Sequence, residues 1–261
     1  MRCASLGSGS RGNATVVESG TTRVLVDCGF SARETRRRLQ RLDLDPDSLS
    51  AILVTHEHRD HIAGVGVVAR NLGLPVYMTA GTARAAESLV AELPELVEFG
   101  VHEPFELDDL RIEPFPVPHD ARDPAQFVIV DSDCSVGLLT DAGHVTPVMR
   151  LALAEVDFLM LEFNHDQQML RNGNYPPALI ARVDSDYGHL NNGQAVDLLN
   201  GLNGNHLKGV AALHLSQENN HPERVQQCLN EVLKADVDGV APHTTIACQN
   251  EGFGWFNVRQ S

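Results

Sequence analysis

The feature that most constrains this chain is a run of metal-binding residue types, His56-x-His58-x-Asp60-His61. Composition alone predicts this pattern roughly 0.002 times in such a chain, so chance explains it poorly. While the chain is extended, side chains two positions apart point the same way, so His56 and His58 converge on one ion. A turn into a helix then redirects Asp60 and His61 toward a second ion nearby. The motif therefore predicts ligands for two metal ions; a single ion, with Asp60 only orienting a histidine, is the alternative.

The motif lies between a strand-like and a helix-like stretch, and the same alternation runs along the chain. Residues 51–54 form a continuous apolar run that predicts a central strand, and residues 62–72 predict the helix after it. A helix is also predicted for 81–93, whereas 164–189 is a long, loop-rich segment of the kind that often carries function. There is no repeat, linker or low-complexity tract, so the sequence predicts one α/β domain spanning residues 1–261.

Further metal ligands are predicted at the ends of later strands. Four ligands on one segment cannot complete two coordination spheres, so distant residues must contribute. His119, Asp141 and His214 each follow an apolar run that is typical of a strand, and α/β proteins keep their sites at strand ends. A shell of imidazole and carboxylate without thiolate admits Zn²⁺, Mn²⁺ or Fe²⁺. We therefore expect two divalent metal ions as cofactors.

Composition excludes several classes of protein. The 20 Lys and Arg residues against 35 Asp and Glu give a net charge of −15, which disfavours a nonspecific nucleic-acid binder unless metal ions or a local basic face reverse the field. The five cysteines show no C-x-x-C spacing, which argues against a disulfide framework. Charge-free stretches stay well short of the ~20 apolar residues that span a bilayer, and the start of the chain lacks the apolar core of a signal peptide. We expect a cytoplasmic protein that does not enter a membrane; its oligomeric state, a homo-oligomer included, is left open.

In the order and type of these residues the chain resembles the metallo-β-lactamase fold superfamily, and the resemblance covers nearly the whole chain. It implies a four-layer αββα sandwich with the site at the rim of the sheets. It also implies that Asp141 bridges two metal ions and that Asp27 braces the histidine segment rather than touching metal. Members that hydrolyse β-lactams carry Cys at the bridging position, so antibiotic hydrolysis is not expected here. The implied ligands are His56, His58 and His119 for one ion and Asp60, His61 and His214 for the other.

Several short segments carry a narrower resemblance, namely 5–14, 26–31, 116–120, 164–166 and 187–190. Together they are similar to the YycJ (WalJ) group of bacterial metallo-β-lactamase-fold proteins. This resemblance implies 5′-to-3′ exonuclease action on double-stranded DNA. We therefore expect DNA, rather than RNA, as the substrate. The group commonly has a small residue where this chain has Arg59 and Phe163, so substrate contacts near these two positions are expected to differ.

The chemistry expected at such a site is phosphodiester hydrolysis. Two divalent ions about 3.5–4 Å apart lower the pKa of a bridging water toward ~7, and the resulting hydroxide attacks in line with the leaving oxygen. That oxygen needs a proton, for which His189 is the first candidate. Glu162 ends a predicted strand, and the pair is similar to that of tRNase Z enzymes, in which a Glu orients a His as general acid. His165, beside Asp166, is the competing acid or phosphate ligand. With Asp60, these residues complete the predicted catalytic set.

Three other functions remain open. The same ligands serve hydrolases of thioesters or lactones. A tRNase Z-like RNA-processing nuclease is disfavoured, because only 21 residues separate His119 and Asp141, too few for the tRNA-binding arm of those enzymes. The spacing from Asp141 to His214 likewise leaves no room for the β-CASP domain of related nucleases. A non-enzymatic metal-binding regulator is the third alternative. The sequence therefore favours a dinuclear metal-dependent phosphodiesterase acting as a DNA exonuclease.

Overall fold

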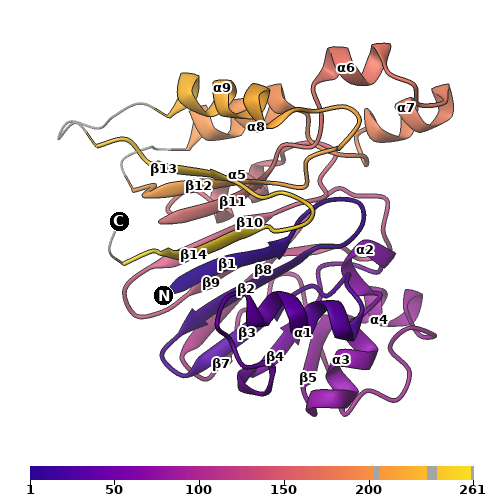
Figure 1. The fold of residues 1–261 in the computed structure, drawn as a ribbon, viewed down its shortest axis with the longest axis vertical. Helices are drawn as coiled ribbons and strands as arrows, with labels where there is room; N and C mark the ends of the chain where they lie inside the picture. Colours follow the sequence, from indigo (N-terminus) through magenta and orange to yellow (C-terminus); the bar gives the residue numbers. More distant parts are fainter. Residues whose placement is uncertain (203–205, 234–239, 260–261) are drawn as a thin grey trace.

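The computed structural model describes residues 1–202, 206–233 and 240–259, and its centre is a pair of seven-stranded sheets stacked face to face (Figure 1). The first sheet has the order β14-β1-β2-β3-β4-β5-β6. Its strands β3 to β6 run parallel, and the C-terminal strand β14 pairs antiparallel with β1. The strands are β1 (Arg2–Gly7), β2 (Ala14–Ser19), β3 (Thr22–Val26), β4 (Ala51–Leu53), β5 (Pro75–Thr79), β6 (Glu95–Phe99) and β14 (Phe253–Asn257).

The second sheet has the order β13-β12-β11-β10-β9-β8-β7. Strands β10 to β13 run parallel, and β9 is antiparallel to both β8 and β10. Strands β8, β10, β11 and β12 therefore run in one direction, and their carboxyl ends meet at one edge. The strands are β7 (Phe105–Leu107), β8 (Leu110–Pro116), β9 (Ala125–Val130), β10 (Ser135–Leu139), β11 (Phe158–Glu162), β12 (Gly209–Leu213) and β13 (His243–Ile246).

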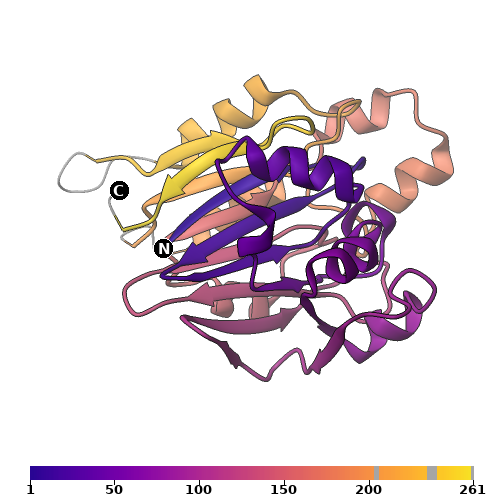
Figure 2. The same ribbon diagram turned by 60° about the horizontal axis from the view of Figure 1, so that its bottom comes forward.

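Helices cover the outer faces of both sheets, which confirms the αββα sandwich (Figures 1 and 2). The first sheet carries α1 (Ala32–Gln40), α3 (Val65–Leu72) and α4 (Ala80–Ala85), and the second carries α5 (Pro147–Ala152), α8 (Asn192–Gly201) and α9 (Pro222–Val232). The short helices α2 (Arg59–Ile62), α6 (Gln167–Asn172) and α7 (Pro177–Val183) gather at one end of the sandwich. Among the described residues, no helix has the length and apolar character needed to cross a membrane.

An apolar core to which both sheets contribute holds the two sheets together. Phe127 and Phe158 are fully buried there, and burying each side chain contributes roughly 1.5–3 kcal/mol. Every residue of β4 is buried as well, because this strand has a sheet on one face and helices on the other. This two-sided burial explains why residues 51–54 read as a continuous apolar run.

The segment 164–189, predicted to be loop-rich, contains the two helices α6 and α7. Asp166 caps α6 by accepting a hydrogen bond from the Met169 N–H, and α7 starts with a proline in its first turn. No residue of α7 is fully buried. Its apolar residues at helical spacing, Leu179, Ile180 and Val183, span only about one turn, which is too short a pattern to predict a helix. We call residues 166–187 the arm.

The helix predicted for 81–93 is also shorter in the structure. α4 ends at Ala85, and the chain then turns, with the Leu89 and Val90 N–H groups both donating to the Ala86 carbonyl. Val90 is buried against the helices of the first sheet, and β6 follows. Tertiary packing here overrides the helical propensity of the sequence.

Candidate metal centre

The candidate residues of the second sheet stand where its parallel strands end. His119 follows β8, Asp141 follows β10 and His214 directly follows β12. Glu162 is the last residue of β11, which lies between β10 and β12. The shared edge therefore brings together four side chains that are far apart in the sequence.

The histidine segment approaches the same edge from the first sheet. It leaves β4 in extended form, as the sequence predicts. His58 is the N-cap of α2, a short helix ahead of the one predicted for 62–72, which is α3 in the structure. The Asp27 carboxylate accepts hydrogen bonds from the Thr55 N–H and hydroxyl, each at 2.8 Å, and from His61 Nδ1 at 2.7 Å. Asp27 thus braces the segment and does not join the ligand cluster.

The loop after β3 packs directly on this segment at Gly29. A Cβ on Gly29 would overlap the backbone carbonyl of Asp60. The close approach is held by hydrogen bonds from the Asn13 N–H to the Asp60 carbonyl and from the Cys28 N–H to the His61 carbonyl, both at 2.7 Å. Only glycine lets the two backbones meet here.

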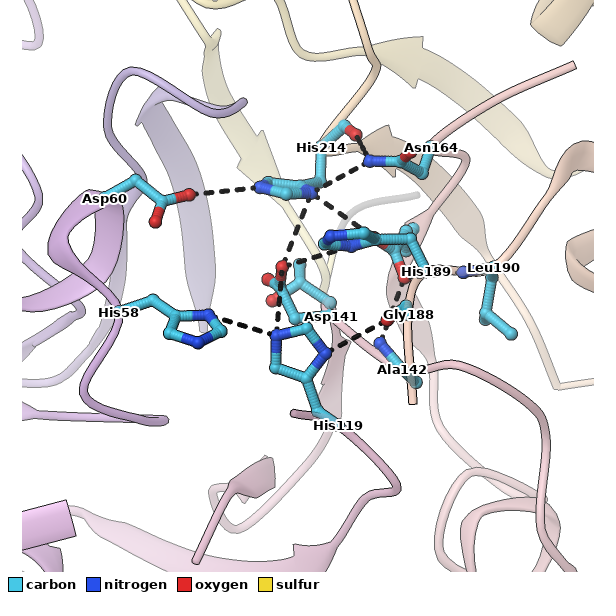
Figure 3. Close-up of polar contacts among 12 residues, drawn as sticks. His58, Asp60, His119, Asp141, Ala142, Asn164, Gly188, His189, Leu190 and His214 are labelled. Atoms are coloured by element: carbon cyan, nitrogen blue, oxygen red, sulfur yellow. Dashed lines mark hydrogen bonds and ion pairs between the residues drawn. The ribbon is translucent and has the colours of Figure 1, made fainter. Parts of the chain in front are cut away.

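The first predicted ligand group is assembled. Ligand atoms of His56, His58 and His119 lie within 4.8 Å of one another. His119 Nε2 is 3.2 Å from His58 Nδ1, and the opposite nitrogen of His119 donates to the Gly188 carbonyl at 3.0 Å (Figure 3). In the described part of the chain, His56 Nε2 is buried without a hydrogen-bond partner. Buried polar atoms normally have a hydrogen-bond partner, and a bound metal ion would satisfy this nitrogen.

The second predicted group is assembled beside it. Ligand atoms of Asp60, His61 and His214 also lie within 4.8 Å of one another. Asp60 Oδ2 is 3.5 Å from both His61 Nε2 and His214 Nε2. Asp141 lies between the groups, with Oδ2 at 3.1 Å from His61 Nε2 and Oδ1 at 4.0 Å from His119 Nε2. Asp141 thus lies beside both groups, where the superfamily resemblance places the bridging carboxylate.

Three residues of the site adopt left-handed backbone conformations. The φ angles are 59° for Asp27, 53° for Asp141 and 55° for His214. Such conformations cost a non-glycine residue of order 1–3 kcal/mol and persist only where the surroundings impose them. Their presence at the ends of β3, β10 and β12 shows that the sandwich holds these side chains in place at a cost in stability.

Contacts with residues outside the two ligand groups fix which nitrogen of three of the histidines faces the other ligand candidates. His61 and His119 donate from Nδ1 to Asp27 and to the Gly188 carbonyl, so in each neutral ring Nε2 carries the lone pair. His61 Nε2 also lies 3.1 Å from Asn13 Nδ2. His58 is turned the other way, because its Nε2 lies 3.7 Å from Asp120 Oδ1 and its Nδ1 faces His119. Asp120 was not among the predicted site residues, and only its place next to His119 in the sequence hints at this role.

The donor set fits divalent metal ions, and the two groups differ in charge. Burial lowers the pKa of His56 and of His119, so these imidazoles are neutral donors. Burial would also lower the pKa of His214, but the Asp141 carboxylate, helped by Asp60 and Glu162, raises it to about 10. A cation at the second group would take the place of such protons, since metal ligands must bind deprotonated.

His189 and Glu162 form a pair at the edge of the cluster. His189 Nδ1 donates to Glu162 Oε1 at 2.8 Å and lies 3.3 Å from Asp141 Oδ1 (Figure 3). Glu162 Oε2 accepts from the Ala142 and Leu190 N–H groups, each at 3.1 Å, so the carboxylate is fixed on both sides. Burial would lower the pKa of His189, but the Glu162 carboxylate outweighs it and raises the pKa.

His165 is placed differently. Its ring is buried and does not line the pocket over the cluster. His165 Nε2 lies 3.8 Å from Asp184 Oδ1 at the end of α7, and Nδ1 lies 3.3 Å from Asn164 Oδ1. The placement favours a role in holding the arm over direct contact with substrate.

A pocket of about 340 Å³ opens over the cluster. His189 and the metal-ligand candidates Asp60, Asp141 and His214 line its base, and the arm lines its outer side. His189 therefore faces the space in which a substrate would meet the cluster.

Comparisons with known proteins agree with this geometry. A model of the β-lactamase superfamily domain matches residues 22–210, more than half of the chain. The chain belongs to the β-lactamase superfamily. The superfamily fold and the clustered His and Asp residues make it a metal-dependent hydrolase.

Individual superfamily members are similar over most of the chain. Exodeoxyribonuclease YycJ of Bacillus anthracis is 35% identical over 237 residues, which cover 90% of this chain and 90% of that protein. Exodeoxyribonuclease WalJ of Streptococcus pneumoniae is 36% identical over 239 residues, 89% of this chain and 88% of that protein. The crystal structure of the metallo-β-lactamase fold protein YhfI of Bacillus subtilis has a TM-score of 0.74 at 16% identity and covers 98% of this chain and 99% of that chain.

Two asparagines to which the sequence analysis assigned no role support two of the proposed ligands. Asn13 Nδ2 donates to Asp60 Oδ2 at 3.3 Å, and Asn164 Nδ2 donates to the His214 carbonyl at 3.0 Å. Asn13 ends the glycine-rich loop after β1, and Gln249 holds that loop by donating to the Gly12 carbonyl at 2.8 Å. Asn13 lies in segment 5–14 and Asn164 in segment 164–166, and both segments carry the narrower resemblance.

Proposed function

We propose that this protein is an exodeoxyribonuclease that uses two divalent metal ions, Zn²⁺, Mn²⁺ or Fe²⁺, to degrade double-stranded DNA from the 5′ end. The observation that carries the proposal is the pair of adjacent ligand groups with Asp141 beside both, together with the His189–Glu162 pair. The relatives named exodeoxyribonuclease, similar along almost their whole length, support DNA as the substrate.

The ligands of the proposed ions are the seven residues of the two groups and the bridging position. When bound, the ions supply an activated water and neutralise charge on the scissile phosphate. The ligands are His56, His58, Asp60, His61, His119, Asp141 and His214.

His189 supplies the proton in this proposal. With Nδ1 held by Glu162, a protonated ring presents its second proton on Nε2 to the leaving oxygen of the phosphodiester. The Glu162 carboxylate raises the pKa of His189 and so favours the protonated ring. Glu162 orients the ring and stabilises its charge, and does not contact substrate.

The net charge of −15 is compatible with DNA binding at this one place. Two divalent ions would add +4 at the cluster, against the carboxylates of Asp60 and Asp141. The surrounding acidic surface repels DNA elsewhere, so affinity is expected to come from the pocket.

The test is hydrolysis of end-labelled duplexes by the purified protein loaded with Mn²⁺ or Zn²⁺. We expect metal-dependent release of nucleotides from the 5′ end, and its loss in Asp60→Asn. Asp197→Asn is the matched control, because this exposed residue on α8 has no side-chain contact in the described part of the chain. A metal-loaded protein that leaves duplexes intact and turns over a thioester instead would overturn the proposal.

A further inference from the structure

The walls of the pocket come from different parts of the molecule. Arg59 reaches it from α2, at the end of the first sheet, whereas Tyr175 and Leu179 reach it from the arm, beside the second sheet (Figures 1 and 2). None of these three residues belongs to the ligand groups or to the His189–Glu162 pair. The mechanism above leaves them without a role.

Arg59 is an exposed cation without a partner. Its guanidinium forms no ion pair or hydrogen bond with the residues that the structure describes, although it lines a pocket that contains carboxylates. Arg182, the other arginine of the pocket, is engaged: its Nε donates to Asp120 Oδ2 at 2.6 Å. Arg59 is therefore the guanidinium that is free to meet an incoming anion.

Tyr175 is an aromatic ring on a stiff support. It is half-buried and is followed by Pro176 and Pro177, whose rings restrict the backbone. Pro176 has φ −57° and ψ 146°, the extended conformation typical of proline-rich segments. Leu179 and Val183 of α7 line the pocket next to it. The arm thus presents an aromatic and apolar surface above a polar base.

We propose that Arg59 and Tyr175 form a subsite for the terminal nucleotide of a DNA strand, in which Arg59 binds the phosphate next to the scissile one and Tyr175 stacks on the base. The subsite rests on the proposed function. The pocket volume of about 340 Å³ is at the small end for ligand pockets, which suits one nucleotide of a frayed end and not an intact duplex. Stacking on an aromatic ring accepts any base, as an exonuclease requires.

The experiment measures binding of a duplex whose 5′-terminal linkages are hydrolysis-resistant phosphorothioates, by fluorescence anisotropy with the metal-loaded protein. Affinity falls as the salt concentration rises, and each phosphate contact makes this fall steeper. Loss of one contact in Arg59→Ala is therefore expected to make the plot of log affinity against log salt shallower, with a slope less negative by about 0.7. Arg84→Ala, which removes an exposed arginine outside the pocket, should leave the slope unchanged. An unchanged slope in Arg59→Ala would overturn the phosphate contact.

The base contact is tested with a matched pair of substrates. Tyr175→Ala should weaken binding about tenfold when the terminal nucleotide carries a base, and should have no effect when that nucleotide is abasic. Tyr175→Phe should bind like the wild type, as should Tyr187→Ala, which removes an exposed tyrosine of the arm outside the pocket. An equal loss on both substrates would mean that Tyr175 only supports the arm.

The outcomes separate the subsite from the reaction. Both binding signatures in a protein that does not hydrolyse DNA would support the subsite and reject the proposed function. Hydrolysis of DNA without either signature would reject the subsite and retain the function. In an active enzyme, both variants should raise KM and leave kcat nearly unchanged, because the contacts are the same in the ground state and the transition state.

Discussion

The base and the outer wall of the pocket are built in opposite ways. The base is built on the seven proposed ligand residues, and all of them except His58 and Asp60 are buried. The arm buries no residue of α7 and is joined to the base by a few contacts, among them Arg182 to Asp120 and the Asp120 N–H to the Tyr187 carbonyl. We therefore expect separate tasks: the buried base would carry the chemistry proposed above, and the exposed arm would contact what is bound.

The largest effect is expected from changing the base. Asp141→Asn removes the shared carboxylate between the two groups, so metal binding and hydrolysis should both fall to the level of metal-free protein. Metal ions bind only the folded state and should raise the Tm of the wild type, a shift that Asp141→Asn should lose. Metal content and Tm with and without Mn²⁺ check this, with Asp197→Asn as control. Full metal content in Asp141→Asn would show that the base does not depend on this carboxylate to bind metal, and would contradict the division of tasks between base and arm.

The pair at the junction of base and arm should affect turnover alone. His189→Ala is expected to lower kcat by about 10²–10⁴-fold while metal content stays at the wild-type level. Glu162→Gln should lower kcat by less. The double variant should be no slower than His189→Ala, because both residues act as one unit. Single-turnover rates at saturating metal measure this, and additive losses would show that Glu162 acts independently of His189.

A smaller effect is expected where the arm is anchored. Asp120 lies between His58 and Arg182, so Asp120→Asn should weaken metal binding by roughly tenfold, the lower end for outer partners of metal-binding histidines. Arg182→Ala should cost less, and the two changes should be strongly non-additive. Metal titration of the two single variants and the double variant gives the coupling. Independent effects would show that the arm does not influence the base.

The smallest effect is expected outside both regions, at Glu34 on α1. Arg37 and Arg38 lower the pKa of Glu34 to about 2. A lowered pKa stabilises the fold above the unfolded value near 4.5 and loses this contribution as the pH falls toward 2. Glu34→Gln should therefore lower the free energy of unfolding by about 0.5–1 kcal/mol at pH 7 and by less at pH 3, with metal binding unchanged.

Urea unfolding at the two pH values measures this difference. Glu87→Gln is the matched control, since Glu87 is exposed and makes no side-chain contact among the described residues. The prediction for Glu34→Gln also requires unchanged metal binding. A loss of metal binding or of hydrolysis in the folded variant would show that the contacts of α1 reach the pocket.

What the sequence predicted and what it missed follow the same division. The histidine motif and the strand-end residues were visible because buried strands give apolar runs and ligands cluster at their ends. That His119 and Asp141 lie close together at the sheet edge was known only from the superfamily resemblance, because the number of residues between them does not give their distance in space. The helices of the arm were missed because α7 is short and buries no residue fully. Asp120 and Asn13 lie in the resemblance segments 116–120 and 5–14, but no pattern in the sequence assigned either of them a role.

The contact between Gln249 and the glycine-rich loop ties the centre to a segment far away in the chain. Asn13 supports Asp60 from a loop that Gln249 holds, and β14 pairs with β1 just beyond it. We therefore expect the centre to be sensitive to proteolysis at a distance. A cut shortly before Gln249 would leave all seven proposed ligands in the chain and remove the support of Asp60.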